Sequence, residues 1–140
     1  MLEIKELTKE FKTGAFGKKT FKAVNKASFE IDDKDIISLI GESGSGKTTI
    51  GRMILRLTQI SSGKIIYNGE DISDIKNRDL KKYYRKVQGI FQDPFSTFNP
   101  IFKADRVFRM VKSEFYPELS QREWNDKLYE SLTSVGLNPN

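Results

Sequence analysis

Two residue types with frequent catalytic roles are absent from this 140-residue chain. It contains no cysteine, which excludes a disulfide framework, a thiolate metal site and a cysteine nucleophile. It also contains no histidine, the side chain most often used as a general base or metal ligand. Any chemistry must therefore depend on carboxylates, amides or bound metal. The lack of cysteine is also typical of a protein from a reducing compartment.

The chain also lacks a long apolar run. No stretch approaches the ~20 residues needed to span a membrane, so we expect a soluble chain with the length of one ordinary domain. The net charge of +5 is modest. Nucleic acid or an anionic membrane is a conceivable partner for the densest basic patch. We interpret it as a solvated helix face, because nearby Tyr83 and Tyr84 are adjacent and not spaced as a stacking platform. The patch comprises Lys76, Arg78, Lys81, Lys82, Arg85 and Lys86.

The most informative feature that is present is a phosphate-binding pattern. Residues 41–48 fit G-x-x-x-x-G-K-[ST], after the apolar residues 36–40 and before a helical pattern. The glycines let successive backbone N–H groups converge on phosphate oxygens, and a helix beginning at Gly46 directs its positive dipole end at the same charge. Lys47 is placed to reach the terminal phosphates, and Thr48 to supply a hydroxyl to Mg²⁺. Nucleotide binding is the leading hypothesis, against a glycine-rich turn with an incidental lysine.

Hydrophobic periodicity predicts an α/β fold. We interpret residues 36–40 and 87–91 as neighbouring buried strands of a parallel core. The other strands are expected at residues 2–7, 23–31 and 64–67, with a loop at 12–20 and a turn at Asn68-Gly69. Helices are expected from Gly46 to before Ser61, at 77–86, at 104–115, and from the capping box at Ser120 to a stop at Gly136.

Because of two motifs taken together, the chain resembles the ATP-binding subunits of ABC transporters. One is the phosphate loop with Lys47, and the other is Phe91-Gln92-Asp93-Pro94, which places Gln92 45 residues later (92 − 47). Residues 7–11, 62–65 and 68–72 are also similar to this family, so the resemblance covers essentially the whole chain. The stretch FQDPFSTFNP at residues 91–100 is similar to the oligopeptide and dipeptide importer branch.

This resemblance implies a fold and a division of the chain. The implied fold is a P-loop NTPase core with an antiparallel β edge and the start of a helical subdomain. Residues 1–100 would form the ATP-binding core, and residues 101–140 the beginning of the helical subdomain. We expect the chain to be an amino-terminal part of a longer ATPase.

The resemblance also implies roles for single residues. Gln92 would turn its amide oxygen to Mg²⁺ or to the attacking water, and Phe11 would stack on adenine, although Phe16 and Phe21 lie in the same region. The implied catalytic residues are Lys47 and Gln92, the metal ligands are Thr48 and Gln92, and the cofactors are ATP and Mg²⁺. The cofactor-binding residues are Phe11, Gly41, Glu42, Ser43, Gly44, Ser45, Gly46, Lys47, Thr48 and Thr49.

The family's later motifs are not in this sequence. After Gln92 there is no Leu-Ser-Gly-Gly, no apolar run of four ending in an acidic residue, and no switch histidine. Phosphoryl transfer needs positioned water, metal and charge stabilisation together, so we expect the chain to bind ATP without efficient hydrolysis.

For the parent protein, the resemblance implies import of peptides or a similar solute. It would lie peripherally at the cytoplasmic face of the membrane, contact permease subunits through the segment after Gln92, and pair with a second ATPase subunit, with no nucleic acid partner. Three alternatives remain open: a non-transport ABC ATPase acting in DNA repair or translation, a binding-only ATP sensor, and a P-loop kinase.

Overall fold

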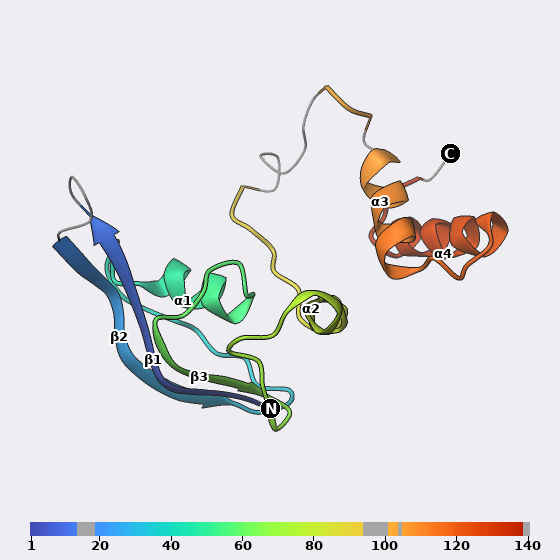
Figure 1. The fold of residues 1–140 in the computed structure, drawn as a ribbon. Coiled ribbons are helices and arrows are strands. Elements are labelled where there is room, and N and C mark those ends of the chain that lie inside the picture. The colour runs from blue at the N-terminus through green and yellow to red at the C-terminus, as the bar shows by residue number, and fades with distance from the viewer. Residues whose placement is uncertain (14–18, 94–100, 104, 139–140) are drawn as a thin grey trace. The chain divides into compact units, whose positions relative to one another are not determined.

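The computed structural model describes residues 1–13, 19–93, 101–103 and 105–138 (Figure 1). The chain divides into two compact units, Met1–Gln88 and Gly89–Asn140. The functional boundary expected at residue 100 stays a prediction. Phe16 and residues 94–100, which include the end of the importer-like stretch, lie outside the described residues.

The first unit is built on a four-stranded antiparallel sheet with the order β2-β1-β3-β4, and Figure 1 shows β1 between β2 and β3. The strands are β1 (Leu2–Thr13), β2 (Lys19–Ile31), β3 (Ser62–Tyr67) and β4 (Glu70–Asp71). The β1–β2 hairpin is longer than predicted, because Lys12 and Thr13 pair with Thr20 and Lys19 where a loop was expected. Asn68 and Gly69 have φ values of 50° and 83°, which confirms the predicted tight turn between β3 and β4.

The core of the first unit lies between this sheet and two helices, α1 (Lys47–Ile54) and α2 (Asn77–Tyr84). Met53 of α1 and Tyr83 of α2 are buried against it. The sheet contributes Ile4, Leu7, Val24 and Ile65, and the segment after β4 contributes Ile72. The apolar stripe predicted for the first helix therefore does face the sheet.

The first helix ends earlier than predicted, and Leu57 beyond it is 55% exposed. Arg56 has φ 55°, the left-handed conformation that usually belongs to glycine after a helix. Its N–H donates to the carbonyl of Met53, and the N–H of Leu57 donates to that of Arg52. These two bonds form a Schellman motif, which terminates α1. The sequence has no glycine at this position, so it gave no signal of the helix end.

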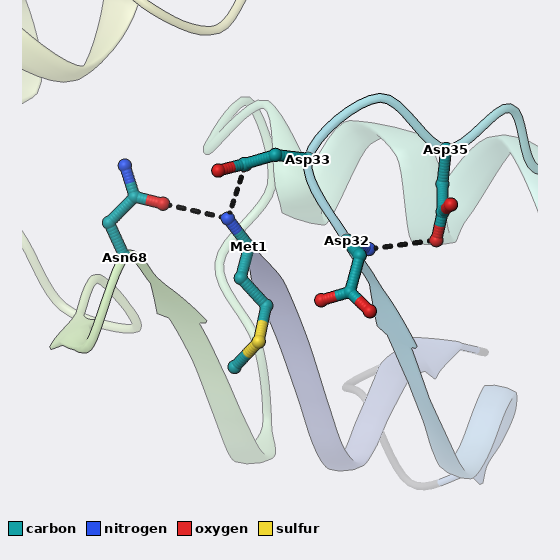
Figure 2. Close-up of polar contacts among 5 residues, drawn as sticks. All are labelled: Met1, Asp32, Asp33, Asp35 and Asn68. Atoms are coloured by element: carbon teal, nitrogen blue, oxygen red, sulfur yellow. Dashed lines mark hydrogen bonds and ion pairs between the residues drawn. The ribbon is translucent and has the colours of Figure 1, made fainter.

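The amino group of Met1, at the start of β1, donates hydrogen bonds to two neighbouring turns (Figure 2). It donates to Asp33 Oδ1 at 2.7 Å and to Asn68 Oδ1 at 2.8 Å. In the same turn as Asp33, the N–H of Asp32 donates to Asp35 Oδ2 at 3.0 Å. These groups are exposed, so each bond contributes little stability by itself, but together they join the ends of three strands.

The two inner strands predicted at residues 36–40 and 87–91 are wrong for this structure. Every described strand pair is antiparallel, and neither segment belongs to a strand. Ile36 and Ile40 are 97% and 93% exposed, and Ile90 is fully exposed. A strand requires a neighbour for its N–H and C=O groups. Neither segment has such a neighbour among the described strand pairs.

The second unit contains α3 (Asp105–Phe115) and α4 (Gln121–Ser134), which confirms both predicted helices over the described residues. Trp124 is buried, with its ring centroid 5.7 Å from that of Tyr116. The predicted capping box is also confirmed: Ser120 Oγ accepts from the N–H of Glu123, and Glu123 Oε2 accepts from the N–H of Ser120 at 2.9 Å. Gly136, with φ 79°, follows the end of α4 as expected. In neither described unit does a helix have the length and apolarity needed to cross a membrane.

The capping box makes the start of α4 sensitive to pH. Hydrogen bonds from the hydroxyl and the N–H of Ser120 lower the pKa of Glu123 below its ordinary value. A carboxyl whose pKa is lower in the folded state stabilises the fold above its unfolded-state pKa, and this contribution is lost as pH falls through the folded-state value. We therefore expect the amide-exchange protection factors of residues 121–124, which correct each rate for its intrinsic pH dependence, to fall on acidification through that range.

Ser120→Ala should remove most of this pH dependence, because the hydroxyl bond is the largest cause of the lowered pKa of Glu123. Ser131→Ala is the matched control, since the Ser131 hydroxyl donates to the Lys127 carbonyl in the middle of the same helix. Identical exchange profiles for the wild type and Ser120→Ala across the acidic range would contradict the prediction.

Candidate phosphate-binding site

The predicted phosphate loop lies in the first unit and leads directly into α1. Gly44 and Gly46 have φ values of 83° and 96°, where an L side chain is strained. Gly46 is the N-cap residue of α1 and offers no side-chain cap, and the first turn of α1 contains no acidic residue. The N–H groups at the start of this helix therefore have no side-chain acceptor there, which leaves them available to an anion.

Strand β2 holds the end of this loop in place. A Cβ atom on Gly46 would lie 2.4 Å from the carbonyl oxygen of Ala23 and 3.2 Å from Val24 Cγ2. Only glycine fits at such a distance from a backbone oxygen. Val24 is itself buried in the core, so the position of the loop depends on the β1–β2 hairpin as well as on its own sequence.

Lys47 folds back over the loop. Its Nζ donates to the carbonyls of Gly41 at 2.7 Å and Glu42 at 2.6 Å, and to Ser45 Oγ at 3.2 Å. The loop is further closed by the N–H of Ser45 donating to the Glu42 carbonyl at 3.2 Å. The ammonium group is therefore held over the backbone of the loop, where an entering anion would compete with these three oxygens for it.

The structure brings together only part of the predicted site. Residues 41–49 form the loop and the first turn of α1, with Thr48 exposed and Thr49 partly buried. Phe11 lies on β1 in the same unit and is 40% exposed. Gln92 is exposed and belongs to the second unit. Its joint role with Thr48 as a metal ligand therefore stays a prediction.

The residues suited to a metal ion are few. Across the described ranges, no three acidic or histidine side chains gather closely enough to hold one. A hard cation such as Mg²⁺ at the loop would need oxygen from the Thr48 hydroxyl, from bound phosphate and from water. The role of Thr48 as a ligand of Mg²⁺ stays a prediction.

The structure places the basic patch on and around α2, and its interpretation as a solvated helix face stays a prediction. Its six lysine and arginine side chains are exposed. Among these side chains, Lys82 pairs with Asp79 at 3.1 Å and Lys76 with Asp74 at 3.9 Å. Tyr83 is buried and its hydroxyl donates to the carbonyl of Ile54, so it offers no ring for stacking.

A cleft of about 510 Å³ lies away from the predicted loop. Burial raises the pKa of Tyr83, one of the residues that line this cleft, to about 12. No sequence motif marked this cleft, because its walls come from β3, β4, α2 and the segment between them. None of its residues belongs to the predicted nucleotide site. The lining consists of Tyr67, Glu70, Asp71, Ile72, Ile75, Asp79, Lys82, Tyr83 and Lys86.

Comparison with known proteins identifies relatives over nearly the whole chain. A family profile described as ABC transporter matches residues 24–139. The oligopeptide transport ATP-binding protein AppF of Bacillus subtilis is 36% identical over 99% of this chain, and OppF of the same organism is 37% identical over 99%. OppF of Streptococcus pyogenes serotype M1 is 38% identical over 98%. The chain spans only 44%, 45% and 44% of these three relatives.

Solved structures agree on the fold. The dimeric bacterial ABC transporter cassette MJ0796 superimposes with a TM-score of 0.79 at 24% identity, covering 99% of this chain and 59% of that one. The same cassette in a post-hydrolysis state, bound to ADP and Pi, gives the same values. This likeness confirms the predicted fold class, an incomplete ATP-binding cassette, while the identity is too low to carry function.

Proposed function

This chain belongs to the ABC transporter family, and on that premise we propose that it is the ATP-binding part of a transport ATPase. The observation that carries the proposal is the geometry of the phosphate loop. Two glycines with positive φ, an uncapped helix start and the Lys47 ammonium converge on one short segment. The names of the oligopeptide transport relatives support oligopeptides as the transported solute, and the similarity of residues 91–100 extends the proposal to dipeptides.

The residues present fit a nucleotide phosphate chain. Positions 44 and 46 carry no side chain that fills the loop, and the first turn of α1 carries no carboxylate that repels an anion. In this proposal the loop N–H groups bind phosphate oxygens, Lys47 neutralises the terminal phosphates, and the Thr48 hydroxyl binds Mg²⁺. Phe11 stacks on the base. The bound Mg-ATP would supply the transferable phosphoryl group and much of the charge neutralisation.

The remaining roles concern the longer protein. We assign Gln92 to sensing the γ-phosphate and the segment after it to contact with permease subunits. We place the protein peripherally at the cytoplasmic face of the membrane, paired with a second ATPase subunit. Support comes from the family and from the transport ATP-binding relatives. Because the signature motif, the acidic strand end and the switch histidine are not in this sequence, we propose ATP binding without efficient hydrolysis for the 140-residue chain.

A titration of the purified chain with Mg-ATP tests this proposal, with phosphate release recorded in the same samples. Lys47→Ala should weaken binding by roughly tenfold to a hundredfold, because it removes charge-assisted hydrogen bonds to phosphate. Neither protein should release phosphate at a rate above the background.

Lys64→Ala is a matched control, because Lys64 is an exposed lysine of β3 that pairs with Asp71 at 3.6 Å, away from the loop. It should bind Mg-ATP like the wild type. The proposal fails if Lys47→Ala binds as tightly as the wild type, or if the wild type binds no nucleotide.

A further inference from the structure

Two exposed phenylalanines face each other across the β1–β2 hairpin. Phe11 of β1 and Phe21 of β2 are direct partners in the strand register, and they are 40% and 56% exposed. Directly opposed residues of an antiparallel pair project on the same side of the sheet. The hairpin therefore presents two aromatic side chains side by side on one face.

Strand alternation identifies which face this is. Leu7, Lys9 and Phe11 are alternate residues of β1, so they share a face. Their partners on β2 are Ala27, Val24 and Phe21, and the extra residues that shift the register lie on β2. Leu7 is completely buried in the core. Phe11 and Phe21 therefore lie on the core face of the sheet, near the hairpin end where the core no longer covers it.

The same face carries the phosphate loop. Val24, on the same face as Phe21, lies against the end of that loop, with its Cγ2 3.2 Å from the position of a Cβ on Gly46. Along β2, the exposed ring of Phe21 therefore lies three residues before the buried Val24, which contacts the loop. Aromatic faces exposed next to a phosphate site are suited to a nucleobase, because a base stacks on an aromatic ring through its π-face.

The surroundings of the two rings differ. Lys9 Nζ lies 5.0 Å from the centroid of the Phe11 ring, so a cation already occupies one side of that ring. Among the residues that the structure describes, no ring or cation contact involves Phe21. Phe11 therefore offers at most one free face, whereas the more exposed Phe21 ring is not engaged by a described aromatic or cationic group.

We propose that Phe21 is a second base-contacting residue, so that the purine ring of the nucleotide binds against the Phe11–Phe21 pair. This inference rests on the proposed ATP binding and adds to it a residue that the phosphate-loop pattern does not include. Each aromatic contact strengthens binding of the nucleotide and contributes nothing to binding of the phosphate chain alone.

The test compares Mg-ATP with Mg-tripolyphosphate, which lacks base and ribose, as calorimetric ligands of the 140-residue chain. Phe21→Ala should weaken Mg-ATP binding by roughly fivefold or more and leave tripolyphosphate binding unchanged. Phe21→Trp should bind Mg-ATP at least as tightly as the wild type. Thr20→Ala, on the opposite face of the same strand, should change neither affinity.

Each other outcome counts against a distinct claim. Unchanged Mg-ATP binding by Phe21→Ala overturns the role of Phe21, while the phosphate site stands. Equal weakening of both ligands also overturns it, because the hairpin would then act through the fold. If wild-type chain binds tripolyphosphate as tightly as ATP, the base makes no contact and the inference fails. If it binds neither ligand, the proposed function fails, and the inference fails with it.

Discussion

Gly46→Ala is expected to destabilise the first unit by about 3 kcal/mol or more and to abolish Mg-ATP binding. The φ of 96° at this position strains any L side chain, which costs on the order of 1–3 kcal/mol. The added Cβ would also lie 2.4 Å from the Ala23 carbonyl oxygen, an overpacking that costs on the order of another 1–3 kcal/mol. The strand cannot retreat easily, because Val24 is buried and pairs with Lys9. Urea unfolding and Mg-ATP titration measure the two effects.

Two glycines of the same region serve as controls. Gly44 has a similar φ of 83° but no heavy atom within 4 Å of the added Cβ. Gly44→Ala should therefore lower the stability only by the backbone strain of the left-handed conformation, about 1–2 kcal/mol. Gly51 lies inside α1 with open space around its Cβ position, and Gly51→Ala should stabilise the helix by up to about 1 kcal/mol. A Gly46→Ala protein no less stable than Gly44→Ala would show that β2 does not confine the loop.

Gly63→Ala is expected to disrupt the pairing of β1 with β3, at a cost of about 4 kcal/mol or more. Gly63 has φ 91°, and its added Cβ would lie 2.4 Å from the Glu6 carbonyl oxygen and 2.6 Å from that of Lys5. Both oxygens belong to the backbone of β1, where the register with β3 shifts between Lys5 and Thr8. Neither flexible side chains nor solvent can relieve this clash. Amide exchange in β3 and the urea midpoint of the first unit measure the loss.

The control for this substitution is Gly69→Ala in the β3–β4 turn. Gly69 has φ 83° with nothing within 4 Å of its Cβ position, so only the conformational strain of about 1–2 kcal/mol is expected. Trp124, the single tryptophan, is buried in the second unit, and its fluorescence reports that unit independently. Equal losses for Gly63→Ala and Gly69→Ala would contradict the steric argument.

Local features were predictable because neighbouring residues decide them. The capping box at Ser120 and Glu123 closes within four residues, and Asn68-Gly69 carries its own turn preference. The glycines of residues 41–48 likewise predict a turn into α1, and Gly44 and Gly46 do adopt positive φ, while the binding of phosphate by this loop stays a prediction. For the same reason periodicity predicted the helices, and most of the predicted helix ends lie within one helical turn of the observed ends.

Non-local pairing was not predictable in this way. The apolar composition of residues 36–40 indicated a buried strand, but a strand forms only against a hydrogen-bonding neighbour, and Ile36 and Ile40 are exposed here. Arg56 ended α1 in a conformation that its residue type does not favour.

The residue pattern along the chain was thus enough to predict the loop at residues 41–48, the turn at Asn68-Gly69, the capped start of α4 and the family, which the comparisons confirmed. That β2 confines Gly46 and that Phe21 lies opposite Phe11 became visible only in the folded chain. The Phe11–Phe21 pairing depends on the register between β1 and β2, which shifts at three places, and the Gly46 contact depends on how the loop packs on β2. A pattern of side chains along one strand does not contain that register.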